Sequence, residues 1–469
     1  MIKRFITQVI LVFVIMFGLT NGIHTQALAS NQLKIESKLF TLLEETELPV
    51  EVIIHFNTST QNESKAILKS VGIEKGILLN KLPLAGTVAT KKQVEQLAKS
   101  QSVQSIYYNQ KLQYENADAT RITGVDQVRT DSTFMKTNKG LPITGKGIGV
   151  LINDSGVDGT HQDLEFKNHL VQNVTSSLNL HALSDLLPIT YVEDVPNTDS
   201  NSGHGTHVAG IVGGTGEMSG GKHEGVAPGA DLIGYGSGAG LAIMDTLGAF
   251  DYALTHQFEY NIRVITNSWG DTSEAGLPFD PNHPINIATK NLFDRGILTV
   301  FSAGNSGSAE GTISGNYKKA PWVVTVAAGT KTGGLTSFSS RGKENVNGTV
   351  VIDGEEWTWL DQPTVTAPGE NITSTRVISP IPVLGVVDDA EFIEPAYMPF
   401  YTTMSGTSMA APHVAGIAAL LFEANPTLSP LEMKEILETT STPMDYEPWE
   451  VGSGYVNAYN AVKMAYSYK

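Results

Sequence analysis

The sequence predicts an α/β fold built on a mostly parallel, doubly wound sheet, and three observations support this prediction. From about residue 145 onward, short runs rich in Val, Ile, Leu and Ala alternate with stretches of helical character. Near-continuous apolar strands are typical of parallel sheets whose two faces are both covered by helices. The 46 glycines and 21 prolines are scattered through these stretches, which indicates many tight turns and no long disordered linker.

The composition indicates a large globular protein. With 469 residues, of which 41% are hydrophobic and 17% charged, the chain is long enough for more than one domain. A net charge of −17 leaves no basic surface for phosphates, so no nucleic-acid partner is expected. The sequence contains no cysteine, so stability has to come from core size or from bound ions rather than from disulfides.

Residues 1–29 have the features of a secretory signal peptide. A basic start at residues 1–4 precedes an apolar stretch over residues 5–19, and Ala27-Leu-Ala29 is a small-x-small cleavage signal. The apolar stretch is shorter than the ~20 residues that a membrane span needs, which disfavours the alternative of a retained anchor. A secreted, bacterial protein with no membrane contact after signal cleavage is therefore expected.

Residues 30–116 are predicted to form a small α+β domain. Strands are expected at 50–56, 76–84, 85–89 and 103–108, and helices at 63–71 and 91–99. This β-α-β-β-α-β order is the split βαβ, or ferredoxin-like, plan.

Residues 117–469 are predicted to form the doubly wound α/β domain. Strands are expected at 148–152, 231–234, 263–266, 297–301, 322–326 and 363–366, and helices at 204–213, 242–256, 285–295, 408–424 and 430–440. Functional side chains of such sheets gather at the carboxyl ends of the strands, so candidate site residues are expected there.

A candidate nucleophile is Ser408, which begins a helix of small residues. Free backbone N–H groups at a helix N-terminus favour a developing oxyanion, although capping alone explains an isolated Gly-Thr-Ser. His204 also begins a helix and has the pKa range of a base near neutral pH, whereas His207 is expected to pack. Asp154 and Asn305 each follow a strand, where a carboxylate can orient the histidine and an amide can bind an oxyanion; alone, each is also a turn signal.

Together these segments resemble the signature segments of the subtilases, the subtilisin-like serine proteases. They read Asp154-Ser-Gly, His204-Gly-Thr-His-Val-Ala-Gly, Gly304-Asn and Gly406-Thr-Ser-Met-Ala-Ala-Pro, in the chain order Asp, His, Ser. The last segment lacks the final glycine of G-x-S-x-G, which argues against an α/β-hydrolase. The resemblance covers roughly residues 125–468 and implies a secreted serine endopeptidase that forms an acyl-enzyme, with Asp154, His204 and Ser408 as the triad and Asn305 in the oxyanion hole.

The resemblance also implies how substrate binds. It assigns pairing with the substrate backbone to Gly236, Ser237 and Gly238. It assigns the first wall of the P1 pocket to Ser268, Trp269 and Gly270, and the second wall to Ser302, Ala303 and Gly304. Pairing through main-chain groups implies broad specificity on protein or peptide substrates, and the second wall suggests that a large P1 side chain is accepted.

The resemblance further implies that residues 30–116 are a propeptide, which assists folding and inhibits the enzyme until the enzyme cuts it off, between residues 114 and 119. A permanent accessory domain is the alternative. An inactive binding protein is disfavoured because every catalytic position is filled, and an adhesion protein is disfavoured because repeats and a sorting tail are missing. A monomer is expected.

Three stretches are longer than a minimal subtilase needs, residues 168–200, 341–362 and 378–401. The second reads as a hairpin with its turn at Asp353-Gly354, and its tryptophans are expected to pack on the body. The chemistry requires no cofactor, but a structural Ca²⁺ bound by acidic loop residues such as Glu193, Asp194 and Asp199 would compensate for the missing disulfides. The metal ligands stay unknown at this point.

Overall fold

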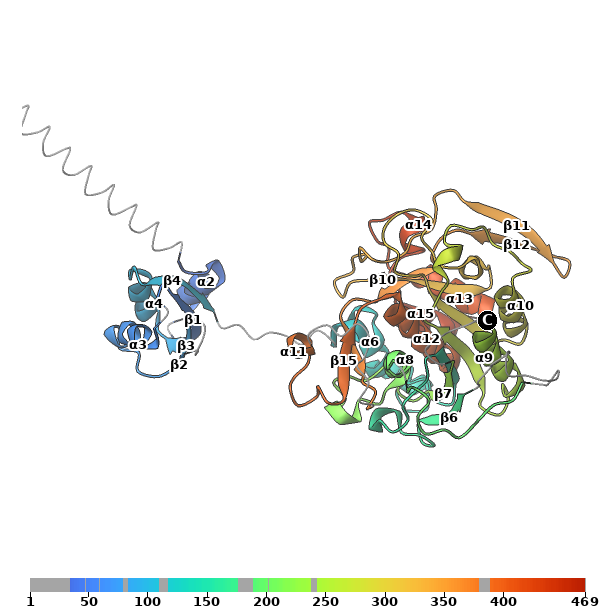
Figure 1. Ribbon diagram of the computed structural model, residues 1–469, viewed down its shortest axis with the longest axis horizontal. Helices are drawn as coiled ribbons and strands as arrows, with labels where there is room; N and C mark the ends of the chain where they lie inside the picture. Colours follow the sequence, from blue (N-terminus) through green and yellow to red (C-terminus); the bar gives the residue numbers. More distant parts are fainter. Residues whose placement is uncertain are drawn as a thin grey trace, which may run out of the picture. The chain divides into compact units, whose positions relative to one another are not determined.

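The protein consists of two compact units, Met1–Gln113 and Tyr114–Lys469, each with its own hydrophobic core (Figure 1). The computed structural model describes residues 34–46, 48–58, 60–78, 83–108, 117–175, 189–200, 202–237, 243–378 and 389–468. The predicted signal peptide and residues 114–116 of the predicted cleavage region lie outside the described residues.

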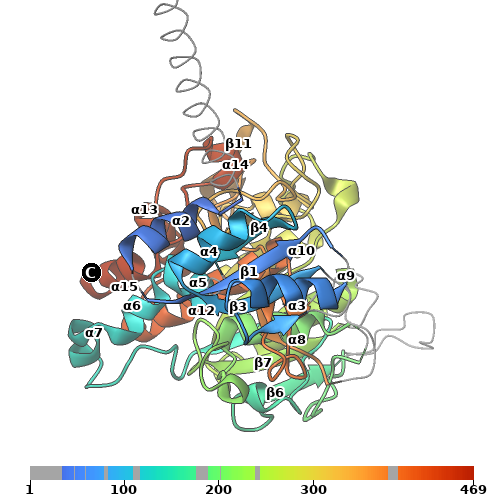
Figure 2. The same cartoon turned by 90° about the vertical axis from the view of Figure 1, so that its left-hand side faces the viewer.

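The first unit is a four-stranded antiparallel sheet with the predicted order of elements. Its elements are α2 (Ser37–Glu45), β1 (Val50–Phe56), α3 (Gln61–Ser70), β2 (Ile77–Leu78), β3 (Leu84–Ala89), α4 (Lys91–Ala98) and β4 (Val103–Tyr108). The strands lie in the order β2-β3-β1-β4, and Figure 2 shows α3 and α4 across one face. Alternate residues of β1, namely Val52, Ile54 and Phe56, are buried, as expected for a sheet packed on one side. Helix α2 was not predicted.

The second unit is an α/β domain. Its strands are β5 (Gly149–Asp154), β6 (Leu170–Thr175), β7 (Asp231–Gly236), β8 (Ile262–Asn267), β9 (Leu298–Ser302), β10 (Val323–Gly329), β11 (Asn347–Ile352), β12 (Glu355–Leu360), β13 (Val365–Pro368), β14 (Ile372–Thr375) and β15 (Tyr401–Met404). Its α-helices are α5 (Ala117–Ile122), α6 (Val125–Thr130), α7 (Ser132–Thr137), α8 (His204–Gly213), α9 (Ile243–Thr255), α10 (Pro284–Asp294), α11 (Asp389–Phe392), α12 (Thr407–Ala424), α13 (Pro430–Thr440), α14 (Pro448–Val451) and α15 (Ala458–Ser467), with short 3₁₀ turns such as η4 (Thr272–Glu274) and η5 (Asn316–Lys319).

Seven parallel strands form the central sheet, in the order β13-β10-β9-β8-β5-β7-β6. Side chains of one strand point alternately to its two faces. In β5, Val150 and Ile152 join the core that contains α8, α12, α13 and α15, whereas Leu151 joins the core that contains α9 and α10 (Figure 1). Both faces of the sheet are therefore covered by helices, which confirms the predicted doubly wound fold.

Strand β6 lies in a stretch that the sequence marked only as an insertion. It pairs with β7 at the sheet edge, although its middle residues Gln172 and Asn173 are polar and buried. Asn173 Nδ2 donates to Val157 O at 2.9 Å, and Asn173 Oδ1 accepts from Thr198 Oγ1 at 2.9 Å. These hydrogen bonds satisfy the amide, so a strand without an apolar pattern is tolerated here.

The hairpin predicted within residues 341–362 is confirmed. Ile352 pairs with Glu355 across β11 and β12, so Asp353-Gly354 is a two-residue turn, with φ of 53° and 87° at its two residues. Positive φ at both residues is typical of a type I′ turn. Trp359 is only 8% exposed, and the ring of Trp357 contacts that of Trp322 at 5.6 Å, so the tryptophans pack on the body as predicted.

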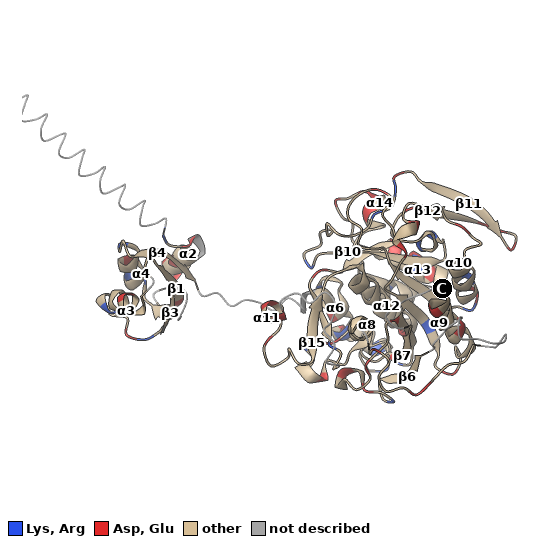
Figure 3. Cartoon of the chain, in the orientation of Figure 1, with Lys and Arg blue, Asp and Glu red and all other residues tan. Residues whose placement is uncertain are grey.

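Helix α12 lies at the centre of the second unit. Within the described part of the chain, α12 is the one helix long and apolar enough to cross a membrane, but 83% of it is buried among the sheet and the other helices, as in the core of a soluble fold. Along the described part of the chain, Lys and Arg positions are interspersed with Asp and Glu positions (Figure 3).

Candidate active site

Asp154 is the last residue of β5 and contacts His204 directly. Its Oδ1 lies 2.6 Å from His204 Nδ1 and accepts from Ser155 N at 2.7 Å. The side chain is buried, and Oδ2 has no hydrogen-bond donor among the described residues. A Cβ at Gly205 would overlap Gly156 O and lie 3.0 Å from Asp154 Cβ, so the glycine after His204 lets the helix start approach the strand end.

His204 is the first residue of α8, and Asp199 anchors the start of that helix. Asp199 Oδ1 accepts from Gly203 N at 3.0 Å, and Oδ2 accepts from Thr206 N at 3.0 Å and from Thr206 Oγ1 at 2.6 Å. Burial lowers the pKa of His204, but the charge of Asp154, its hydrogen bond and the charge of Asp199 together outweigh this effect, and the pKa ends above its ordinary value. The imidazole is 31% exposed, so it is accessible to a substrate.

Ser408 lies in the first turn of α12 and is joined to Ser268 by two hydrogen bonds. Ser408 Oγ donates to Ser268 O at 3.1 Å, and Ser268 Oγ donates to Ser408 O at 2.9 Å. Pro412 explains the second bond, because proline has no N–H to donate to the carbonyl four residues earlier. In the described part of the chain the Ser408 hydroxyl makes no hydrogen bond to His204, although α12 packs against α8.

Asn305 follows β9 and is held by Thr407, which sequence reasoning missed. Asn305 Oδ1 accepts from Thr407 N at 2.9 Å and from Thr407 Oγ1 at 3.0 Å, and Gly304 N donates to Thr407 Oγ1 at 3.0 Å. Because a backbone N–H can only donate, the amide oxygen must face Thr407. Nδ2 therefore points away from Thr407, and it has no partner among the described residues. The only sequence signal for this role was a hydroxyl directly before Ser408.

The predicted substrate-binding residues gather at the same edge of the sheet, apart from Gly238, which lies outside the described residues. Ser237 N donates to Asp154 O at 2.9 Å, and Trp269 Nε1 donates to Asn153 O at 2.9 Å. Gly236, Ser268, Gly270, Ser302, Ala303 and Gly304 end or follow β7, β8 and β9, which are neighbours of β5 or of each other in the sheet. The parallel order therefore places these segments beside Asp154.

His207 packs inside the domain, as predicted. Its Nε2 lies 3.0 Å from both Ile372 O and Thr402 O, on the hairpin of β14 and β15. Burial is the main cause that lowers the pKa of His207 to about 3. The ring therefore stays neutral and donates to these carbonyls.

The acidic residues proposed for calcium do not fit a calcium site. Asp199 uses both carboxylate oxygens at the start of α8, Glu193 accepts from Tyr252 OH at 2.6 Å, and Asp194 pairs with Lys167. A Ca²⁺ site needs six to eight oxygen ligands that converge on one point. Within the described ranges, no three His, Asp or Glu side chains are grouped to hold a metal ion.

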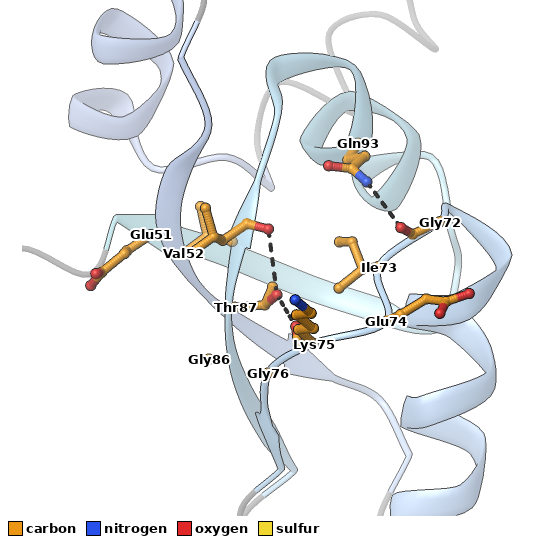
Figure 4. A pocket seen from close by; sticks show the side chains of 11 residues that line it. Glu51, Val52, Gly72, Ile73, Glu74, Lys75, Gly76, Gly86, Thr87 and Gln93 are labelled. Atoms are coloured by element: carbon orange, nitrogen blue, oxygen red, sulfur yellow. Dashed lines mark hydrogen bonds between the residues drawn. The ribbon is translucent and has the colours of Figure 1, made fainter.

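A cavity of about 620 Å³ lies in the first unit and takes no part in this site (Figure 4). Its walls come from β1, β3, α4 and the segment between α3 and β2. Thr87 Oγ1 donates to Lys75 O at 2.6 Å, and Gln93 Nε2 donates to Gly72 O at 3.4 Å. The lining includes Glu51, Glu74 and Lys75 but no histidine or serine, so it lacks the Ser–His pair of a serine protease.

The model of the subtilase family, Peptidase_S8, matches residues 145–459. The chain belongs to the subtilase family. This subtilase is 30% identical to the serine protease AprX of Bacillus subtilis over 387 residues, which cover 78% of this chain and 76% of the relative. It is 27% identical to subtilisin E of the same species, covering 88% of this chain and 90% of that protein.

A solved structure agrees with these relatives. Sphericase matches with a TM-score of 0.51 and 26% identity, over 71% of this chain and 97% of sphericase. The subtilase is therefore a serine endopeptidase that acts on proteins, in a family whose catalysis needs no cofactor.

Proposed function

We propose that this subtilase is a secreted, self-maturing endopeptidase whose triad is Asp154, His204 and Ser408. The observation that carries the proposal is the 2.6 Å contact between Asp154 Oδ1 and His204 Nδ1 at the end of β5. Helix α8, which begins with His204, packs against α12, which begins with Thr407 and Ser408. Three reactive groups from three distant parts of the chain are thus carried by contacting elements.

The proposed reaction uses the chain's own groups. Ser408 Oγ first leaves Ser268 O by rotation about one side-chain bond, a motion of picoseconds to nanoseconds for accessible side chains. Its oxygen then bonds to the substrate carbonyl carbon while His204 Nε2 takes the hydroxyl proton, and Asp154 stabilises the imidazolium through Nδ1–H. The imidazolium returns the proton to the leaving amine as the peptide C–N bond breaks, and water later releases the acyl group by the same steps.

The oxyanion of the tetrahedral intermediate is proposed to bind Asn305 Nδ2 and the backbone N–H of Ser408. Asn305 Nδ2 has no partner in the described structure, and its direction is set by the bonds from Thr407 to Oδ1. A donor that is oriented before the reaction does not need to reorganise when charge develops.

Substrate is proposed to bind as an added strand along residues 236–238, with its P1 side chain between residues 268–270 and 302–304. Main-chain pairing supplies affinity that depends little on side chains, so specificity outside the P1 pocket is expected to be broad. The protein is proposed to act as a monomer on protein or peptide substrates.

Residues 1–29 are proposed to direct secretion, and residues 30–116 to act as a propeptide that inhibits the enzyme before it is removed. The separate core of the first unit and the division of the chain after Gln113 support the second role. Cleavage is proposed between residues 114 and 119. A permanent accessory domain is the alternative that the experiment below distinguishes.

The test compares the secreted protein with Ser408→Ala by intact-mass spectrometry and labelling with a fluorophosphonate probe. The parent is expected to lose about 85 residues after Ala29 and to take one adduct, whereas Ser408→Ala keeps its first unit and takes none. Ser405→Ala is the matched control, because Ser405 is an exposed neighbour whose Oγ accepts from Asn371 N at 2.8 Å. If the parent neither matures nor reacts, the proposal is wrong and a binding protein becomes the better interpretation.

A further inference from the structure

Lys318 is a buried lysine without a charged partner. It lies in η5, is 1% exposed, and makes one side-chain hydrogen bond, from Nζ to Ser314 Oγ at 3.0 Å. The next residue differs, since Lys319 Nζ forms a buried ion pair with Asp361 at 2.8 Å. No such ion pair involves Lys318 in the described part of the chain. An ammonium group has three N–H donors, so two of those of Lys318 have no partner among the described residues, in an environment where unpaired charge is costly.

The Lys318 ammonium lies beside the first of the two segments proposed to flank the P1 side chain, and its hydrogen-bond partner Ser314 contacts both segments. A Cβ on Gly270 would overlap Lys318 Nζ and Ser314 Oγ, so the first wall leaves this space open only because residue 270 is glycine. Ser314 also contacts the second wall: its N donates to Ala303 O at 3.1 Å, and a Cβ on Gly304 would lie 2.6 Å from its Oγ. Ser314 Oγ therefore lies against both walls, and Nζ lies beside the first wall and is hydrogen-bonded to that hydroxyl.

The two acidic side chains that follow Gly270, Asp271 and Glu274, have other partners. Glu274 bonds to Asn316, and its Oε1 lies 3.3 Å from His283 Nε2, while Asp271 Oδ1 caps the turn at Ser273. Burial alone lowers the pKa of Lys318 to about 7, with no contribution from any carboxylate. A carboxylate that reached Nζ would supply the missing counter-charge.

We propose that Lys318 is the specificity-determining residue at the base of the P1 pocket and that this subtilase prefers glutamate or aspartate at P1. The inference rests on the proposed function, in which residues 268–270 and 302–304 flank the P1 side chain. The P1 carboxylate accepts a charge-assisted hydrogen bond from Nζ, and a neutral P1 side chain leaves that ammonium buried and unpaired. The preference therefore arises from attraction to acidic residues and from a penalty against apolar ones.

The test uses two peptide substrates that differ only in Glu or Gln at P1, since these side chains have nearly the same shape. The parent enzyme is expected to have a kcat/KM about 10- to 150-fold higher for Glu, the range that corresponds to losing a hydrogen bond to a charged group. Lys318→Met, which keeps most of the volume, is expected to bring the ratio close to about 1 while peptides with Leu at P1 are still cleaved. Lys434→Met is the matched control, because Lys434 Nζ donates to Pro321 O at 2.8 Å and is not among the atoms nearest to a Cβ built on Gly270 or Gly304.

Two results would overturn the inference: a Glu-to-Gln ratio near 1 in the parent enzyme, or an equal ratio in the parent and Lys318→Met. If Lys318→Met does not fold, the parent's ratio decides alone. Fluorophosphonate labelling separates the two proposals. A protein that labels and cleaves Leu peptides but not Glu peptides refutes only the P1 inference. A protein that does not label refutes the proposed function, and calorimetric binding of peptides that end in Glu or in Gln then decides the P1 inference.

Discussion

The carbonyl group of Ser408 offers a direct test of how the active-site helix is held. Pro412 cannot donate to it, and Ser268 Oγ does so at 2.9 Å. We predict that Ser268→Ala destabilises the second unit, and that Pro412→Ala removes most of this penalty because the substituted residue has an N–H that can reach Ser408 O. The two positions should therefore be coupled, although Ser268 lies after β8 and Pro412 lies in α12.

The expected magnitude follows from burial. Ser268 is 5% exposed, so Ser268→Ala leaves the carbonyl without a donor in a largely dry environment. Leaving a buried acceptor unsatisfied costs about 1 to 3 kcal/mol in the free energy of unfolding. With Pro412→Ala already present, the same substitution should cost less than about 0.5 kcal/mol, which gives a coupling energy of about 1 to 2 kcal/mol.

The assay is guanidinium unfolding followed by tryptophan fluorescence, with all four proteins carrying Ser408→Ala so that none digests itself. All five tryptophans lie in the second unit, so the signal reports only on that unit. The background substitution also removes the bond from Ser408 Oγ equally from every member of the cycle. If Ser268→Ala has the same cost with and without Pro412→Ala, the proline does not explain the bond and the reasoning is wrong.

Three further predictions concern the reaction. Asn305→Ala should lower kcat about 10²- to 10³-fold with little change in KM, a range measured for such a donor in subtilisin. Asn305→Asp keeps the acceptor for Thr407 but faces the oxyanion with negative charge. A kcat for Asn305→Asp above that of Asn305→Ala would therefore contradict the proposed role of Asn305. The pKa of His204 is raised, and the neutral imidazole is the base, so kcat/KM should rise with pH through a midpoint above about 6.5. A midpoint below that value would contradict the coupling of His204 to Asp154. Because Lys318 loses its charge above a pKa of about 7, the Glu-to-Gln ratio of kcat/KM should fall in the parent enzyme as pH rises from about 6 to 9. In Lys318→Met the ratio should not change with pH. A parent ratio that is independent of pH would contradict the role of the Lys318 charge.

The sequence could predict those site residues whose position depends on the local backbone structure. Asp154 and Asn305 follow strands, and His204 and Ser408 begin helices, so strand ends and helix starts located them before any contact was known. The same logic predicted six of the seven strands of the central sheet. It missed β6 because the pairing partners that satisfy Gln172 and Asn173 come from elsewhere in the chain.

The parts that the sequence could not predict depend on distant partners. The sequence offers Asp199 as one of several candidate calcium ligands, yet its oxygens accept from Gly203, Thr206 and Ser155. No spacing rule distinguishes these two uses of a buried carboxylate. Lys318 and Lys319 are adjacent and chemically identical. Only the fold brings Asp361 to Lys319 and leaves Lys318 unpaired.

An acidic P1 preference also predicts where the chain cuts itself. Residues 109–116 read Asn-Gln-Lys-Leu-Gln-Tyr-Glu-Asn, in which Glu115 is the one acidic residue. Asp118 is the next, but it lies in α5, and a helical segment cannot pair as an extended strand with a protease cleft.

The mature protein should therefore begin at Asn116, which intact-mass spectrometry reads directly. Glu115→Gln should slow maturation by the same factor that separates the Glu and Gln peptides, whereas Gln113→Asn, a neutral change two residues away, should leave the rate and the cut after Glu115 unchanged. A parent enzyme that cuts after Tyr114 or another neutral residue would show that its own junction enters the cleft without a carboxylate at P1. That result would count against Lys318 as the basis of specificity and would leave the assignment of the triad unaffected.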